Sequence, residues 1–410
     1  MEVVYKLHLN NQKKYVQKPY LNTGNGQISN QARKQSKKKC FSPCRLDELA
    51  APPARLRLLP VHQKMTNIRL KKLPLLAAVK PENVKAEKDR FMRANFNYNP
   101  YFMYKGCTDD KTMNTFNYPS DRYLPEAILI LENTIAHFGN FETFEKVTGG
   151  PPITRAGVLS LTKQYLANEN LEDEVRIILK DDLISRGSFI NSHGYYTVHL
   201  RCANLRENCL EGLLNHEVVY FPGTHYLRSY NNKLQPWATL DERNKLDIGP
   251  VNPTEEGLAS LHSIMFRSKP FLWRIALLYY TTYKASKMSF KDTFSDLSKY
   301  VENPDIRWEY CMRAKRGQLD TSRPGSFCKD QVYLVGVLQL LKRRKNLDFP
   351  MLLRLGKVSF RDVNRRCVTD AAKLDKTRIP KFMEDLESYH QKLDNVVKTN
   401  GLTDILSHVE

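Results

Sequence analysis

The chain has 410 residues, 41% of them hydrophobic, which is enough for one large domain or two ordinary ones. No apolar run approaches the roughly 18 residues that a membrane span needs, and the first residues lack the charged-then-apolar pattern of a signal peptide. Eight cysteines are scattered without zinc-knuckle spacing, so we expect reduced thiols in a cytosolic or nuclear protein.

The net charge of +20 lies mostly at the N-terminal end. Residues 1–93 hold 21 Lys/Arg and 6 Asp/Glu, a net charge of +15, whereas the rest of the chain carries only +5. Asn, Gln and Lys dominate up to Lys39, and such a polar, self-repelling stretch does not support a packed core. We predict a disordered basic arm over residues 1–80 and a folded domain over residues 81–410. A basic arm favours a polyanion: nucleic acid, an anionic membrane surface or an acidic protein tail.

The folded part opens with helical patterns followed by two strands. Helices are predicted over residues 81–96, 125–138 and 153–166. In the second of these, Ile128, Leu131 and Ile135 fall on one face, and Thr154 is the expected N-cap of the third. The β-branched and aromatic content of residues 174–179 and 194–200 predicts two strands.

The next helix, predicted over residues 205–218, delivers His216 and Glu217. A second histidine, His225, follows nine residues after the first, which is about 180° around an ideal helix. Pro222 cannot continue that helix without losing a backbone hydrogen bond, so we predict a break near residues 221–223 that places His225 on a separate segment. Two imidazoles with a carboxylate are the ligands and general base of a catalytic zinc. This spacing alone is also that of two unrelated histidines at a helix end.

Downstream, Thr254 is predicted to cap a helix that begins at Glu255 and Glu256. A carboxylate in that first turn also complements the helix dipole without any metal. We expect a loop over residues 313–324. Further helices are predicted over residues 271–283, 288–300, 329–344, 349–355 and 380–397.

Three motifs together resemble one known family. Without residues 219–222, the segment around His216 becomes L-L-N-H-E-V-G-T-H-Y-L-R. This shortened sequence resembles the HExxxH motif of the microtubule-associated tyrosine carboxypeptidases, a zinc peptidase family that removes the C-terminal tyrosine of α-tubulin. Residues 252–259, N-P-T-E-E-G-L-A, resemble the second signature of the family, and the Q-E-G-L-A form of bacterial relatives favours Glu256 over Glu255 as the ligand. A third similar block spans Trp308 to Leu334, and the resemblance runs from about Lys85 to the C-terminus.

The resemblance implies an α+β fold, mainly helical with a small sheet, and a zinc ion held by His216, His225 and Glu256. It further implies that Glu217 activates the attacking water and that the tail of α-tubulin on microtubules is the substrate. A carboxypeptidase must also hold the terminal carboxylate, a task that suits basic side chains, and stabilise the oxyanion. The candidates by position are Arg228, Arg316, Lys329 and Tyr333, and ordinary surface pairing is the alternative for the three basic residues.

The extra residues 219–222 leave two outcomes open. They either loop out, so that both histidines reach the zinc, or displace His216 and Glu217 and leave a microtubule-binding pseudoenzyme without catalysis. A nucleic-acid-binding protein that uses residues 1–93 is a third interpretation, but no RNA-recognition, helix-turn-helix or zinc-finger pattern supports it. We expect a cytoplasmic protein on microtubules, with neither a membrane nor a specific nucleic acid as partner.

Overall fold

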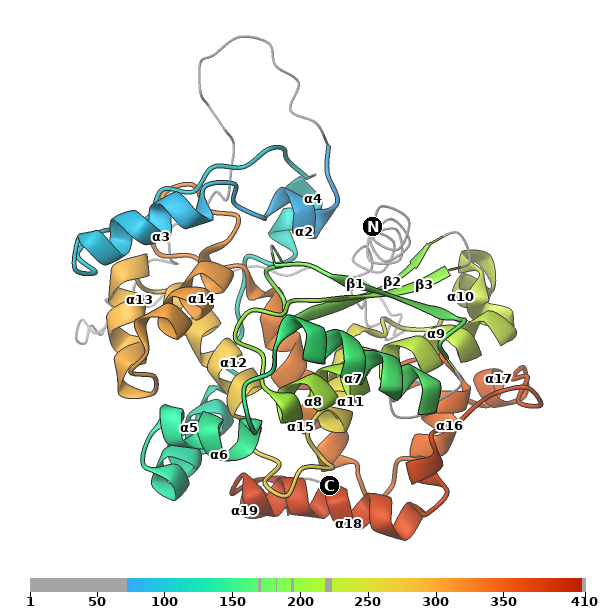
Figure 1. Cartoon of the computed structure of the whole chain (residues 1–410). Coiled ribbons are helices and arrows are strands. Elements are labelled where there is room, and N and C mark those ends of the chain that lie inside the picture. The colour runs from blue at the N-terminus through green and yellow to red at the C-terminus, as the bar shows by residue number, and fades with distance from the viewer. Residues whose placement is uncertain are drawn as a thin grey trace, which may run out of the picture.

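The computed structural model describes residues 72–108, 110–168, 171–181, 183–192, 195–217 and 223–407. Most of the predicted basic arm, up to residue 71, lies outside these ranges, as do the four extra residues 219–222 of the histidine motif. The described part is mainly helical with one small sheet (Figure 1), which confirms the α+β class. None of its helices is both long and apolar enough to cross a bilayer.

The chain before the sheet forms short helices that pack on the later part of the domain. They are α2 (Leu75–Ala78), α3 (Val84–Arg93), α4 (Asp110–Asn114), α5 (Leu124–Phe138), α6 (Phe141–Gly149) and α7 (Arg155–Asn168). The predicted cap of α7 is confirmed, since Thr154 Oγ1 accepts the Gly157 N–H at 3.1 Å. Leu75 and Val79 are buried in a small cluster with Phe327. Packed residues therefore occur before residue 81 as well.

Three strands form the sheet, in the order β1-β3-β2. The central strand β3 (Tyr195–Leu200) pairs in parallel with β1 (Val175–Leu179) and antiparallel with β2 (Gly187–Ser192). Both predicted strands are present, and β2 was missed. Its sequence, G-S-F-I-N-S, combines Phe and Ile, which favour strands, with Gly and Asn, which are depleted in them, so its pairing with β3 defines it.

The second half of the chain is entirely helical in the part that the structure describes. The helices are α8 (Glu207–Glu217), α9 (Thr224–Leu234), α10 (Leu240–Lys245), α11 (Asn252–His262), α12 (Trp273–Ala285), α13 (Phe290–Asp296), α14 (Pro304–Lys315), α15 (Val332–Lys342), α16 (Phe349–Arg354), α17 (Arg366–Thr369), α18 (Leu386–Thr399) and α19 (Thr403–Ser407). Single 3-10 turns lie at Pro236–Ala238, Leu297–Lys299, Cys328–Gln331 and Lys381–Met383. The two histidines of the motif lie on separate segments, as predicted, and the second of these is the helix α9.

Two local predictions were wrong. Thr254 does not cap α11, which begins at Asn252; its hydroxyl instead accepts the Phe360 N–H at 3.1 Å, inside the core. The predicted loop from residue 313 begins too early, because α14 continues to Lys315. That lysine is polar yet fully buried, and its Nζ donates to three backbone carbonyls, an environment that sequence polarity does not reveal.

Two glycines bring α11 and α15 into close contact. A Cβ on Gly257 would lie 2.3 Å from the Gly336 carbonyl carbon, and a Cβ on Gly336 would lie 1.9 Å from the Pro253 oxygen. No other residue type fits at such distances. The carboxylate of Glu256 on α11 and the phenol of Tyr333 on α15 are therefore carried by two helices fixed backbone against backbone.

Candidate metal centre and adjoining cavity

The side chains of His216, His225 and Glu256 converge although they come from three different helices. The two Nε2 atoms of His216 and His225 are 3.3 Å apart. Glu256 Oε2 lies 3.6 Å from His216 Nε2 and 3.5 Å from His225 Nε2. These three ligand atoms form a nearly equilateral triangle, and they are the cluster with metal-ligand geometry among the described residues.

The triangle fits a zinc ion. A tetrahedral zinc with bonds of about 2.0–2.1 Å separates neighbouring ligand atoms by about 3.4 Å, which matches the three edges of 3.3–3.6 Å. Two imidazoles with one carboxylate are also a donor set found in catalytic zinc sites, where a fourth position remains open for water. The residues present therefore fit the metal that the sequence motif implies.

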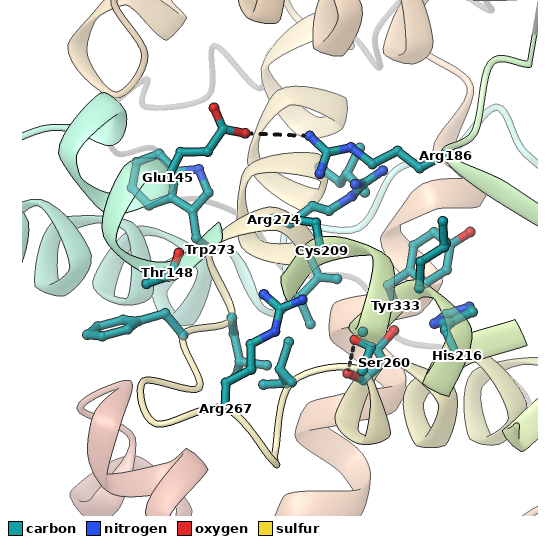
Figure 2. Close-up of a pocket in the computed structure, with 18 of the residues that line it drawn as sticks. Glu145, Thr148, Arg186, Cys209, His216, Ser260, Arg267, Trp273, Arg274 and Tyr333 are labelled. Atoms are coloured by element: carbon teal, nitrogen blue, oxygen red, sulfur yellow. Dashed lines mark hydrogen bonds and ion pairs between the residues drawn. The ribbon is translucent and has the colours of Figure 1, made fainter. Parts of the chain in front are cut away.

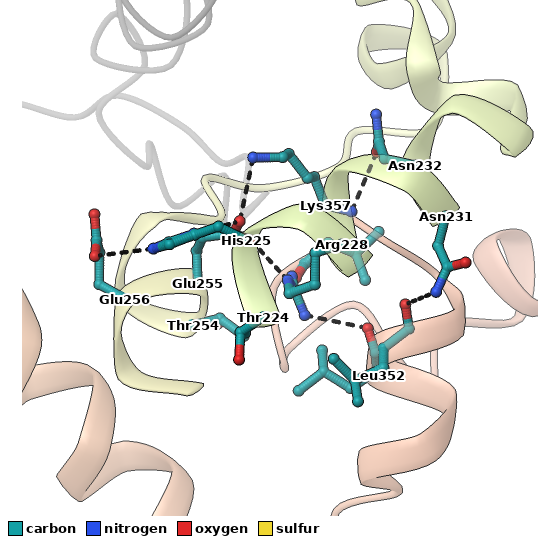
Figure 3. Close-up of polar contacts among 12 residues, drawn as sticks. Thr224, His225, Arg228, Asn231, Asn232, Thr254, Glu255, Glu256, Leu352 and Lys357 are labelled. Carbon is teal, nitrogen blue, oxygen red and sulfur yellow. Dashed lines mark hydrogen bonds and ion pairs between the residues drawn. The ribbon is translucent and has the colours of Figure 1, made fainter. Parts of the chain in front are cut away.

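His225 is held in the orientation that a metal ligand requires. Its Nδ1 lies 3.1 Å from Glu255 Oε1, so the carboxylate fixes the proton on Nδ1 and leaves Nε2 to face Glu256 (Figure 3). Such a carboxylate behind a ligating histidine sets its tautomer and raises its basicity. The two adjacent glutamates thus make different contacts. Glu256 points towards His225 Nε2, and Glu255 hydrogen-bonds Nδ1 on the other side of the same ring.

Arg228 completes this support and is not available to a substrate. It is fully buried, and its Nε donates to Glu255 Oε2 at 2.6 Å. Its two terminal nitrogens donate to the carbonyls of Leu352 and Val358. The expected role of Arg228 in binding the substrate carboxylate is therefore replaced by a supporting role behind His225.

The carboxylates dominate the electrostatics of the centre. Burial lowers the pKa of His225, but hydrogen bonds to Glu255 and Glu256 outweigh it and raise this pKa to about 10. Burial likewise raises the pKa of Glu256, yet the two histidines and Lys329 hold it well below its usual range. The triangle thus attracts positive charge strongly at neutral pH, as a site for a divalent cation must.

Glu217 and Tyr333 flank the same centre. Glu217 is the last described residue of α8 and is buried. It lines, with His216 and Tyr333, one end of a cavity of about 200 Å³. Burial and the nearby charges of Glu256 and Glu217 raise the pKa of Tyr333, so its phenol stays protonated and can donate a hydrogen bond.

The cavity extends from His216 into a pocket lined by arginines and aromatic rings. Arg186, Arg267, Arg274 and Arg313 line it together with Phe141, Phe144 and Trp273. Figure 2 shows Arg186, Arg274 and Arg267 spread from the top to the bottom of the view, with Tyr333 and His216 at the right. A volume of about 200 Å³ is below the roughly 300–1,000 Å³ of sites for drug-sized ligands, and it suits a single amino-acid residue.

Several donors in this pocket lack an acceptor within the described part of the chain. The indole N–H of Trp273 and the Nε–H of Arg267 are buried without a hydrogen-bond partner. Arg274 makes no ion pair there, and burial together with Arg186 and Arg313 lowers its pKa to about 10. Buried donors are normally satisfied, so the pocket presents a set of donors and positive charges that matches a carboxylate.

The other expected substrate residues lie in two different environments. Arg316 is buried, and its guanidinium donates a hydrogen bond to Asp330 at 3.0 Å. Arg313 donates to the same carboxylate. This ion pair holds the Arg316 guanidinium inside the fold, whereas its position in the sequence predicted that it binds the substrate carboxylate. Lys329 is only partly buried, and its charge acts on Glu256, so its proposed contact with a substrate remains open to test.

Sequence reasoning missed all four arginines of the pocket. Arg186 precedes β2, Arg267 follows α11, and Arg274 and Arg313 lie on α12 and α14. Nothing in their local sequence distinguishes them from surface arginines. The one available signal was Arg313, which stands within the third block that resembles the family.

Comparison with known proteins places this geometry in a family. The family model described as microtubule-associated tyrosine carboxypeptidase matches residues 151–400. Human microtubule-associated tyrosine carboxypeptidase 1 is 43% identical over 80% of this chain and 68% of its own length. The MATCAP2 proteins, named as candidate tyrosine carboxypeptidases, are 44% identical in mouse, over 88% of this chain and 68% of the relative, and 37% identical in human, over 93% and 62%. The chain therefore belongs to the microtubule-associated tyrosine carboxypeptidase family.

Proposed function

We propose that this chain is a zinc-dependent carboxypeptidase that removes the C-terminal tyrosine of α-tubulin in the cytoplasm, on microtubules. The observation that carries the proposal is the placement of the arginine-lined pocket directly beside the triangle of His216, His225 and Glu256. A centre that fits zinc would supply the hydrolytic chemistry, and a small pocket lined by four arginines would select the carboxyl end of a chain. The names of the relatives agree with this reading.

In this mechanism the terminal residue enters the pocket with its ring among Phe141, Phe144 and Trp273. Its carboxylate accepts hydrogen bonds from the arginines, of which Arg274 is the one without another partner among the described residues. Charge-assisted hydrogen bonds of this kind are about twice as strong as neutral ones. A peptide that continued beyond the tyrosine would bury its next residues against the same charges, so the pocket favours exopeptidase activity.

The protein side chains then move the proton. Zinc, when bound, acts as a Lewis acid and lowers the pKa of a water from about 16 towards 7. Glu217 accepts the proton of the attacking water and passes it to the departing amine. Tyr333, which stays protonated, donates to the oxygen that gains negative charge. Lys329 is placed to attract the glutamates that precede the terminal tyrosine.

The proposal is tested with the full chain and a tubulin-tail peptide that ends in tyrosine. We expect about one zinc per chain by elemental analysis and release of free tyrosine. Glu217→Gln should lower the rate about 10²- to 10⁴-fold and keep the zinc. Glu207→Gln, a change at an exposed residue in the first turn of the same helix, is the matched control. Zinc near zero in protein purified without chelators would overturn the proposal, and so would an unchanged rate for Glu217→Gln.

The inactive-protein alternative needs its own experiment because residues 218–222 lie outside the described ranges. Deletion of residues 219–222 restores the uninterrupted motif. If the natural chain cleaves the peptide, the interruption is compatible with catalysis. If only the deletion variant cleaves it, the natural chain is a pseudoenzyme, and a microtubule pelleting assay against competitor RNA then tests what its basic part binds.

A further inference from the structure

Within the described part of the chain, the strand β2 pairs with another strand along only one of its two edges. It lies at the end of the sheet order β1-β3-β2, and the paired edge is the one next to β3. The register joins Gly187 to Leu200 and continues one residue further, where the Arg201 N–H donates to the Arg186 carbonyl at 2.8 Å. In an antiparallel pair, bonded and non-bonded residue pairs alternate along the strands.

This alternation identifies the backbone groups that point outward. Because the pair formed by Arg186 and Arg201 is bonded, the next bonded pairs are those of Ser188 and Ile190, and the amides of Gly187, Phe189 and Asn191 face away from β3. Those three residues make no backbone hydrogen bond outside the ladder within the described ranges. They form a row of backbone donors and acceptors without a backbone partner among the described residues, which we call the β2 edge.

The β2 edge starts at the proposed active site. Ser185, Arg186 and Gly187 line the same cavity as His216 and Glu217. Gly187 also packs against Leu213 of α8, since a Cβ on this glycine would lie 2.8 Å from Leu213 Cδ1. The strand therefore leads from the arginine pocket outward, alongside the helix that carries the metal ligand.

We propose that the β2 edge binds the extended tail of the substrate, which adds to the sheet as a fourth strand antiparallel to β2. This inference rests on the proposed carboxypeptidase function. The direction follows from the position of the cavity: the carboxyl terminus must arrive at Gly187, where β2 begins, so the tail runs from Asn191 towards Gly187. An added strand gains affinity from main-chain hydrogen bonds, which suits a disordered tail because it requires no fixed side-chain pattern.

The occupant is an unfolded C-terminal peptide rather than a folded partner. Three outward amides at every second position, with about 3.4 Å per residue, accommodate roughly five to six residues upstream of the pocket. The arginines at the inner end, Arg186 among them, complement a terminal carboxylate. A peptide with a blocked carboxyl end or a helical conformation has neither the charge nor the free amides for this arrangement.

The test is a scan of single N-methyl groups along the tubulin-tail peptide, cleaved by the unmodified full chain. An N-methyl group removes one backbone donor and prevents strand addition at that position only. We expect kcat/KM to fall about two- to tenfold at every second upstream residue and to change less at the residues between them. A flat profile, or equal losses at consecutive residues, would overturn the β2 edge as the binding strand. If the unmodified peptide is not cleaved at all, the proposed function has failed instead.

A variant of the protein gives a second, independent readout. Asn191→Pro removes an outward N–H and leaves the ladder with β3 intact, a position where an edge strand tolerates proline. We expect this variant to reduce the advantage, in kcat/KM, of the long peptide over a blocked dipeptide ending in tyrosine. An unchanged advantage in a variant that unfolds at the normal temperature would contradict the proposal. If the variant does not fold, the N-methyl scan still decides the question.

Discussion

Arg274→Gln tests whether the pocket recognises the terminal carboxylate of its substrate. Arg274 lies on α12, lines the cavity and has no ion-pair partner in the described structure. Burial and the neighbouring charges of Arg186 and Arg313 already lower its pKa to about 10. Its replacement by a neutral residue of similar length therefore removes repulsion and leaves no buried carboxylate unpaired, so we expect thermal stability to be retained.

The expected loss of activity follows from one charge-assisted hydrogen bond. Such a bond contributes about 1.5–3 kcal/mol, which corresponds to about 10- to 150-fold in kcat/KM. Arg313→Gln would be a poor probe of the same question, because Arg313 forms a two-nitrogen pair with the buried Asp330. Removing it would destabilise the fold as well as the pocket.

The assay compares two peptides that differ only at the chain end, one with a free carboxylate and one with a terminal amide. The natural chain should prefer the free acid, and Arg274→Gln should lose most of this preference while cleaving the amide at an unchanged rate. Lys284→Gln removes a positive charge from the same helix at a partly exposed position that pairs with Asp296. This control should keep the preference of the natural chain.

Two results would refute this reasoning about Arg274. One is a natural chain that cleaves acid and amide equally well, which would mean that the pocket does not read the carboxylate. The other is an Arg274→Gln variant that loses the same factor with both peptides, which would indicate a structural effect on the metal centre.

Three further predictions concern the support of the site. Glu255→Gln removes the carboxylate that hydrogen-bonds His225, so it should weaken zinc affinity about 10- to 100-fold, measured by chelator competition. The same change leaves Arg228 buried without its anion, which should lower the free energy of unfolding by about 3–5 kcal/mol. Gly257→Ala should lower the midpoint of thermal unfolding, because its methyl group overlaps the backbone of Gly336; an unchanged midpoint would show that the two helices separate at little cost. Burial and the charge of Arg228 lower the pKa of His262 to about 3. Between pH 3 and pH 6.5, His262 binds a proton only in the unfolded chain, where its pKa is near 6.5. The stability that neutral His262 contributes is therefore complete above pH 6.5 and is lost as the pH falls. His262→Gln should therefore flatten the fall in urea midpoint from pH 6.5 to 4, and a slope equal to that of the natural chain would contradict this assignment.

Local sequence was enough to predict the helix that carries His216 and the chain break before His225. The hydrophobic pattern of residues 205–218 predicted the helix that carries His216, and Pro222 predicted that His225 lies on a separate segment. Both predictions follow from helix geometry and from the backbone N–H that proline lacks, and these effects act over a few residues. The resemblance to the family added Glu256, a residue that periodicity alone describes equally well as a helix-dipole carboxylate.

Only the tertiary structure decided which charged side chains line the cavity. Arg228 and Arg316 appeared suitable by their position in the sequence, and packing buries both against carboxylates. Arg274 appeared ordinary, and packing leaves it facing the cavity without a partner among the described residues. The sequence by itself, with the family resemblance, thus identified the three candidate ligands and predicted the helices that carry His216 and Glu256. The convergence of the ligands, the arginine pocket and the β2 edge depend on contacts between residues distant in the chain, which local propensity does not encode.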